Sequence, residues 1–194
     1  MAKPKGSNKE NLERTRAHLL AVARGQFAQK GFHATSTTAV IEEAGSSRGA
    51  LYHHFRDKTD LFQSVYDSLG GEVADRLETY PYSGQDPVED LIAGCLLYLE
   101  IFVEADFAQI LLIDGPTVLG LDYCRSRDAV TAYKALEEGL AMVNHADFEA
   151  SLMADFLAGA MDSLALRIAL ASNRQTAYRN RVGGFEKLVR KVLV

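Results

Sequence analysis

The sequence predicts an all-α protein in which a three-helix helix-turn-helix domain is joined to a larger helical domain. Two observations lead to this fold class. Apolar residues recur three or four positions apart in almost every long segment, and only four prolines interrupt the 194-residue chain. Hydrophobic residues make up 47% of the sequence, which is ample for a core at this length.

Residues 1–11 are polar, contain Pro and Gly, and lack a periodic apolar signal. We expect them to form a flexible basic tail. Lys3, Lys5 and Lys9 are either simply solvated or add contacts to a nucleic acid, as basic arms do.

A first helix is expected over residues 12–30. Leu20, Ala23 and Phe27 stand at helical spacing, and Gly31 provides the stop. This helix braces the two short helices that follow it.

Two short helices joined by Gly45 are expected over residues 36–55. Hydroxyl residues at 35–38 are candidate caps for the first helix, and Gly45 ends it. At about 100° per residue, the second helix, 47–54, turns Leu51 and Ser47 inward. Its outward arc of roughly 140° then holds Arg48, Gly49, Tyr52 and His53. These groups suit phosphate and base-edge contacts, although a glycine-joined pair also fits an ordinary αα-hairpin.

The next helix is expected to begin at Lys58. Asp57 can cap it and Asp60 suits its first turn, whereas the helix dipole disfavours a cation at Lys58. A nearby phosphate would remove this conflict.

The same helix extends to about Thr79 and is long enough to connect the two halves of the chain. Its apolar stripe consists of Phe62, Val65, Leu69, Val73 and Leu77. Gly70 and Gly71 in its middle mark either a bend or close packing against another helix.

Residues 13–73 resemble the amino-terminal domain of the TetR family of bacterial transcriptional regulators. The matching residues are Leu19, Leu20, Ala23, Phe27, Gly31, Phe32, Thr35, the run 47–55 and the run 58–62. The resemblance implies DNA contacts by Thr37, Ser46, Ser47, Arg48, Gly49, Tyr52, His53, His54 and Lys58.

Within this set the roles differ. The resemblance implies that Thr37 and Lys58 bind phosphates, while Arg48 suits base-edge readout of a guanine. Tyr52 meets either a phosphate oxygen or a thymine methyl. His54 lies nearer the inward side of its helix, yet the resemblance implies that it reaches a phosphate. Ser46 departs from the family, which usually places an apolar residue there to pack inside the turn.

The clearest break in the chain is residues 80–87, which are rich in turn formers. We place the domain boundary near this break. The chain is divided into the tail 1–11, a DNA-binding domain over 12–73 and a helical domain over 74–194. In the last domain we expect a helix from Pro87 to Val103, a short helix at 107–113 that Asp114-Gly115-Pro116 breaks, and a helix near 125–143.

The resemblance also implies that the second half holds a small-molecule inducer, which the sequence does not identify. Its apolar interior is interrupted by polar and aromatic residues that suit a ligand pocket. The candidates are Cys95, Tyr98, Phe102, Leu111, Asp114, Tyr133, Asp155 and Phe156.

The last two helices, about 147–171 and 174–193, predict a homodimer. Phe148, Leu152, Phe156 and Ala160 begin one apolar row, and Met153 begins a second row beside it. A helix apolar over so much of its circumference needs partners on two sides. The resemblance implies a four-helix interface with a second copy, although burial within one chain also satisfies the pattern.

Charge is distributed unevenly along the chain. Residues 1–60 carry ten Lys/Arg and six Asp/Glu, and the remainder carries eleven and twenty. The halves therefore have net charges of +4 and -9, which account for the total of -5. This asymmetry indicates a DNA-facing end on an acidic body that repels DNA elsewhere.

Several site classes are not expected. The histidines, including adjacent His53 and His54, lack metal-ligand spacing, and no phosphate loop or nucleophile elbow appears. We expect no metal, no cofactor and no enzyme activity. Cys95 and Cys124 suit reduced thiols, with a redox sensor as the alternative. No apolar run reaches the roughly 18 residues of a membrane span, so we expect a cytoplasmic protein.

The sequence thus predicts a ligand-responsive repressor that binds a palindromic double-stranded DNA operator as a dimer. Two alternatives stay open, a sequence-independent architectural DNA-binding protein and an all-helical enzyme. Activator or repressor, operator and inducer are not readable from the residues.

Overall fold

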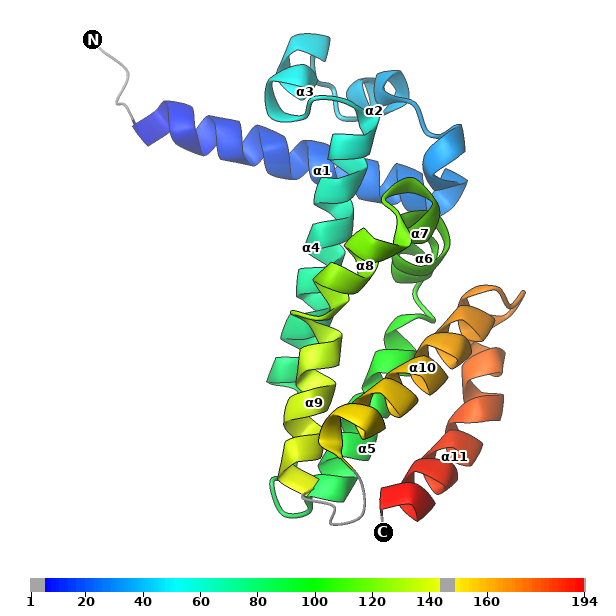
Figure 1. Ribbon diagram of the computed structural model, residues 1–194. Helices are drawn as coiled ribbons and strands as arrows, with labels where there is room; N and C mark the ends of the chain where they lie inside the picture. The colour runs from blue at the N-terminus through cyan, green and yellow to red at the C-terminus, as the bar shows by residue number, and fades with distance from the viewer. Residues whose placement is uncertain (1–5, 144–148, 194) are drawn as a thin grey trace.

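The computed structural model describes residues 6–143 and 149–193, and every regular element in these ranges is helical. The helices form a head, made by α1 to α3, on an elongated body (Figure 1). This arrangement confirms the all-α prediction. The bounds are α1 Gly6–Ala34, α2 Thr37–Glu43, α3 Arg48–His54, α4 Lys58–Thr79, α5 Pro87–Ile101, α6 Ala105–Phe107, the π-helix η1 Ala108–Asp114, α7 Gly115–Val118, α8 Leu121–Asp128, α9 Ala132–Val143, α10 Ala150–Ala169 and α11 Arg174–Leu193.

Helix α1 is longer than the sequence suggested. It begins at Gly6, so residues 6–11 form its first turns rather than part of a flexible tail. An ion pair between Lys9 and Glu13, with N and O 3.9 Å apart, spans one of these turns. The other tail residues, 1–5 with Lys3 and Lys5, lie outside the described part of the chain.

Gly31 breaks the helical backbone of α1, as the sequence predicted, and a short last turn follows it. Gly31 adopts φ 74° and ψ 170° inside a helix that continues to Ala34. Only glycine visits this region readily. The kink turns the last residues of α1 towards α2.

The head has a compact apolar core. Four helices contribute fully buried residues to it, namely Leu19 and Phe27 of α1, Val40 of α2, Leu51 of α3 and Phe62 of α4. The Phe27 and Phe62 rings pack edge to face with centroids 5.1 Å apart. Helices α1 to α4 are therefore fixed relative to one another by shared packing.

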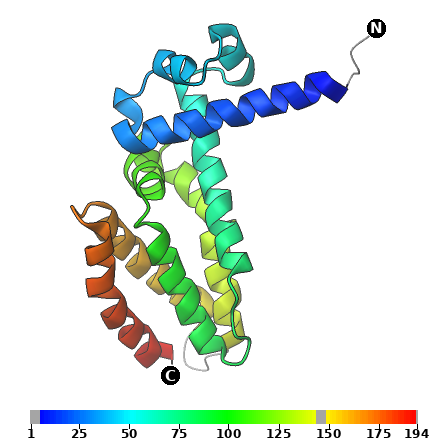
Figure 2. The same cartoon turned by 180° about the vertical axis from the view of Figure 1, so that it is seen from behind.

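Helix α4 leaves the head and runs along the body (Figures 1 and 2). Its bounds and its buried stripe agree with the sequence prediction. The helix is unbroken at Gly70 and Gly71, and a Cβ at either position would meet nothing within 4 Å. The open space at both positions excludes close packing as the reason for these glycines.

The body is a layered set of helices around α5. Helix α5 packs against α4, α9, α10 and α11, and α10 also packs against α9 and α11. Helix α1 contacts α6 and η1 as well as α4, so the head packs against two parts of the body. None of the described helices is long and apolar enough to cross a membrane.

Two predictions about the body were wrong. The chain stays helical through Asp114-Gly115-Pro116, because Gly115 and Pro116 begin α7, where a proline has no intrahelical donor to lose. The expected helix 125–143 is two helices, α8 and α9. They separate at residues 129–131, where the Thr131 hydroxyl donates to the Arg127 carbonyl and competes with the backbone ladder.

Candidate nucleic-acid interface

The turn between α2 and α3 is built by short-range hydrogen bonds. The Ser36 hydroxyl caps α2 by accepting from the Ala39 N–H, at 3.1 Å. Gly45 adopts φ 56° after α2, and the Ser46 N–H donates to the Ile41 carbonyl at 3.0 Å. Ser46 therefore fits the turn through its backbone, although its side chain supplies no apolar packing.

Helix α3 presents one buried side and one exposed side. Its cap is Ser47, whose exposed hydroxyl accepts from the Ala50 N–H at 3.1 Å. Leu51 and Phe55 are buried in the head core. The outward residues are exposed, namely Arg48, Gly49, Tyr52 and His53. Ser47 thus serves as a surface cap, whereas the sequence wheel had turned it inward.

The exposed side of α3 is continuous with the start of α2. The hydroxyls of Thr37 and Tyr52 lie 3.3 Å apart, and the Arg48 guanidinium carbon lies 5.4 Å from the centre of the Tyr52 ring. These contacts hold the arginine and the phenol beside each other on the surface. They bring together three side chains that the sequence placed on two separate helices.

The two histidines at the end of α3 differ in setting. Their rings pack edge to face with centroids 5.2 Å apart. His54 is half-buried, and this burial, with the positive charges of His53 and Arg16, lowers its pKa. A neutral His54 offers a phosphate a hydrogen bond rather than a charge.

Lys58 has protein partners. Its ammonium donates to the carbonyls of Phe32 and Thr35, at 2.9 and 3.0 Å, and lies 4.1 Å from the centre of the Phe32 ring. These acceptors offset the unfavourable dipole at the start of α4. The dipole argument therefore no longer requires a phosphate, and the phosphate contact of Lys58 stays a prediction.

The sequence matches two family models, and together they cover both parts of the chain. Residues 19–65 match the model described as bacterial regulatory proteins, tetR family. Residues 88–192 match the tetracyclin repressor-like, C-terminal domain, which alone spans more than half of the chain. The chain belongs to the TetR family.

Similar proteins agree with this assignment. The HTH-type transcriptional regulator AcrR of Shigella flexneri is 32% identical over 105 residues, which are 54% of this chain and 49% of AcrR. TtgR of Pseudomonas putida is 38% identical over 98 residues, 50% of this chain and 45% of TtgR. The chain thus matches about half the length of these curated relatives. A TetR-family regulator structure from Pectobacterium atrosepticum is 28% identical with a TM-score of 0.78, covering 99% of this chain and 98% of its own.

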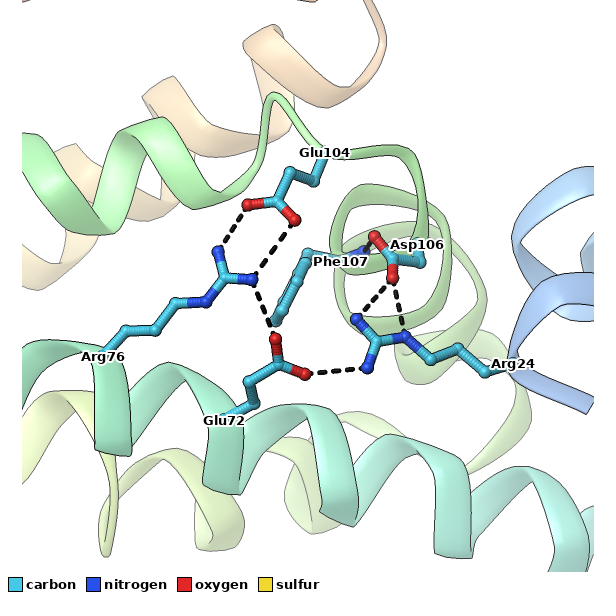
Figure 3. Close-up of polar contacts among 6 residues, drawn as sticks. All are labelled: Arg24, Glu72, Arg76, Glu104, Asp106 and Phe107. Atoms are coloured by element: carbon cyan, nitrogen blue, oxygen red, sulfur yellow. Dashed lines mark hydrogen bonds and ion pairs between the residues drawn. The ribbon is translucent and has the colours of Figure 1, made fainter. Parts of the chain in front are cut away.

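A network of charged residues joins the TetR-type head to the body, and sequence reasoning missed it. Arg24 of α1 donates to Glu72 of α4 and to Asp106 of α6, each at 2.7 Å. Arg76 donates to the other Glu72 oxygen at 2.8 Å and also binds Glu104 (Figure 3). The Glu72–Arg76 pair has i,i+4 spacing and was readable from the sequence. Arg24 and Asp106 are 82 positions apart, and no local pattern relates them.

The two arginines of this network share an aromatic surface. Their guanidinium carbons lie 5.3 Å (Arg24) and 4.7 Å (Arg76) from the centre of the buried Phe107 ring. Burial alone would raise the pKa of Glu72, but hydrogen bonds from both arginines outweigh it and lower that pKa. Glu72 therefore stays ionised at neutral pH and holds α1 against α4.

The body contains a cavity of about 730 Å³ between α4, α5 and α9. Of the predicted pocket residues, Cys95 and Tyr98 line it, and Tyr133 lines a small recess beside it. The prediction missed most of the apolar lining, including Leu77, Leu91, Met142 and Met161, because periodicity marks burial and does not locate gaps between helices.

The other predicted pocket residues lie elsewhere. Phe102 fills core space against the Tyr98 ring, with centroids 5.0 Å apart, and Leu111 is half-buried in η1. Asp114 faces the head, where it accepts from the Phe32 N–H. Asp155 accepts from the Tyr133 hydroxyl at the surface, and Phe156 is 60% exposed.

Part of the predicted dimer surface is exposed. Buried Met153 and Leu157 show that one apolar row of α10 packs within the chain. The other row leaves Leu152 and Phe156 about 60% exposed. Three further leucines are exposed here: Leu166 on α10, Leu170 directly after α10 and Leu188 on α11. Phe148 of the predicted row lies outside the described residues.

The described residues contain no group of three or more His, Cys, Asp or Glu arranged to hold a metal ion. Cys95 is buried in the cavity wall, and burial raises the pKa of its thiol to about 12. A protonated, inaccessible thiol reacts slowly with oxidants, which disfavours a redox role for this residue.

Proposed function

We propose that the protein is a DNA-binding transcriptional repressor that binds a palindromic operator as a dimer and leaves it when a small molecule enters the body. The main support is the capped helix α3, which presents Arg48 and Tyr52 together on an exposed face. Such a helix has the shape and chemistry to enter a major groove. This function places the protein with the chromosome, in the cytoplasm.

The proposed dimer uses α10 and α11. The exposed Leu152, Phe156, Leu166 and Leu188 supply apolar surface that a second copy would remove from water. A twofold axis through this surface would set two copies of α3 side by side, about one DNA turn or a multiple apart.

Ligand response would act through α4. This helix lines the body cavity through Ala74, Leu77 and Glu78, and its first turns belong to the head. Beside the cavity-lining residues, Glu72 and Arg76 connect α4 to α1 and to the α5–α6 junction. A ligand that prefers a different setting of α4 would lower operator affinity by its differential affinity for the two states.

Operator binding tests the first step. Purified protein is titrated with fragments of the DNA that flanks its gene, against scrambled DNA, at two salt concentrations. We expect selective, salt-sensitive binding, and a loss of about 10- to 100-fold in Arg48→Ala. Arg125→Ala on the exposed surface of α8, away from α3 and from the proposed dimer helices, is the matched control and should bind normally. Equal affinity for scrambled DNA would indicate an architectural protein instead.

Sedimentation tests the dimer. Phe156→Glu should shift the protein towards monomer, because it places a charge in the proposed apolar contact. Leu121→Glu changes a comparably exposed leucine on α8 and should leave the oligomeric state unchanged. Equal behaviour of the two variants would contradict the α10–α11 interface.

A further inference from the structure

The body cavity has an apolar interior that suits a hydrophobic ligand frame. Its volume of about 730 Å³ lies within the range of small-molecule sites. Leu77, Leu91, Leu136, Met142 and Met161 contribute to its wall. Tyr82 and Tyr98 also line it, and their aromatic rings offer π faces to a cation.

The charged residues of the cavity wall are mainly acidic. Among the described residues of its wall, Glu78, Asp90 and Glu138 are acidic, and Lys134 is the one cation. Lys134 lies 3.5 Å from Glu138 and is paired with it. The cavity therefore presents no unpaired cation among its described lining residues and favours a positively charged occupant.

A recess of about 20 Å³ opens beside the cavity. It shares Tyr98, Ala132, Leu136 and Met161 with the main cavity, and its other walls include Asp128 and Asp162. A space of this size holds one group as large as a water molecule. An ammonium group meets that limit.

The two carboxylates of the recess are poorly compensated. Asp128 is half-buried, whereas Asp162 is exposed and accepts from the Tyr98 hydroxyl at 3.3 Å. Neither takes part in an ion pair within the described residues. Burial and the charge of Asp162 raise the pKa of Asp128 to about 6, and burial raises that of Asp162, although Tyr98 and Arg125 oppose the rise. A cation placed between them would relieve this cost.

We propose that the cavity binds an organic cation, with an apolar frame against Leu77, Leu91 and Met161 and a charged nitrogen in the recess at Asp128 and Asp162. This inference rests on the proposed ligand-responsive function and names the chemical class of the ligand. The cavity supplies the space for the frame, and the recess supplies the counter-charge.

Three probes with one frame test the charge preference. They are 4-phenylbutylammonium, neutral 4-phenylbutanol and anionic 4-phenylbutyrate, titrated calorimetrically into the full chain at pH 7.5 without DNA. We expect the ammonium to bind at least about tenfold more tightly than the alcohol, and the carboxylate to bind most weakly. Equal or tighter binding of the alcohol or carboxylate overturns the proposal, as does an ammonium Kd above about 10 mM.

Two variants on α8 test the position of the charge. Asp128→Asn should weaken ammonium binding about tenfold while leaving the alcohol unchanged. Asp122→Asn removes the same charge from the exposed start of α8, outside both hollows, and should bind as the natural protein does. Asp162→Asn gives a second test from α10. Full ammonium affinity in folded Asp128→Asn and Asp162→Asn overturns the recess assignment.

Operator binding with and without 4-phenylbutylammonium separates this inference from the proposed function. If the protein binds the operator but shows no preference for the ammonium, the proposed repressor function is supported and the cation site is contradicted. Ammonium binding without an effect on the operator would retain the site and remove its regulatory role.

Discussion

The carboxylate of Asp114 accepts a hydrogen bond from the backbone N–H of Phe32, with N and O 2.7 Å apart. This bond connects the end of η1 in the body to the kink of α1 in the head. Asp114 is only 7% exposed, so water does not replace it easily. The kink frees a backbone donor, and the body provides its acceptor.

We expect Asp114→Ala to lower the free energy of unfolding by about 2 kcal/mol, because it leaves the Phe32 N–H without its partner. Asp114→Asn should lose less, since its amide oxygen can still accept. Urea denaturation of both variants measures the difference. The exposed Asp122→Ala serves as control, and an equal effect in all three would contradict this role.

Gly31 should tolerate no side chain. At φ 74° and ψ 170° an alanine is strained by about 1–3 kcal/mol, and its Cβ would lie 3.4 Å from the Asp114 carboxylate. Gly25 lies within the same helix with open space around its Cβ position, so Gly25→Ala should instead stabilise by up to about 1 kcal/mol. Thermal unfolding of the two variants should therefore shift in opposite directions. Stabilisation by Gly31→Ala would contradict the strained conformation.

The local structure of the head was predictable because short-range rules determine it. Helical spacing placed Leu51 inside and Arg48 and Tyr52 outside, as the structure has them. The caps of α2 and α3 are hydroxyl residues, and Gly45 takes the left-handed conformation. Each feature depends on residues within one turn of the helix.

Contacts between distant segments were not predictable in the same way. The partners of Lys58 lie 23 and 26 positions earlier in the chain, and helical spacing relates neither to it. Asp114 looked like a pocket residue because polar groups in apolar runs often line pockets. The π-helical turn before it carries it to the head instead. The cavity was equally unpredictable, because a gap between helices depends on how the helices pack and not on the spacing of residues along one helix.

The Arg24–Glu72 pair should contribute more than an ordinary surface ion pair. A double-mutant cycle of Arg24→Met and Glu72→Gln should give a coupling energy of about 1 kcal/mol, because both side chains are only about one-third exposed. The highly exposed Lys9–Glu13 pair, treated in the same way, should give about 0.3 kcal/mol. Denaturation at low and high salt adds a second comparison, since the exposed pair is screened more strongly. Equal coupling in the two cycles would show that the network does not brace the head.

Asp128 should make stability depend on pH. Its pKa is raised from 3.8 to about 6 in the folded protein, so between these values the unfolded chain loses this proton first. The free energy of unfolding therefore falls as pH rises from about 4 to 6, and stays lowered above. Asp162 and Tyr98 face the same recess, and Asp128→Asn leaves both in place.

We therefore expect Asp128→Asn to stabilise the protein by about 1–2 kcal/mol at pH 7.5 and to have little effect at pH 4. Urea denaturation at both pH values measures this. Asp122→Asn, at the start of the same helix, removes a carboxylate that the helix dipole favours and should give no gain at pH 7.5. A gain in Asp128→Asn of equal size at both pH values would mean that the effect is one of packing and not of charge, because a protonated Asp128 repels nothing.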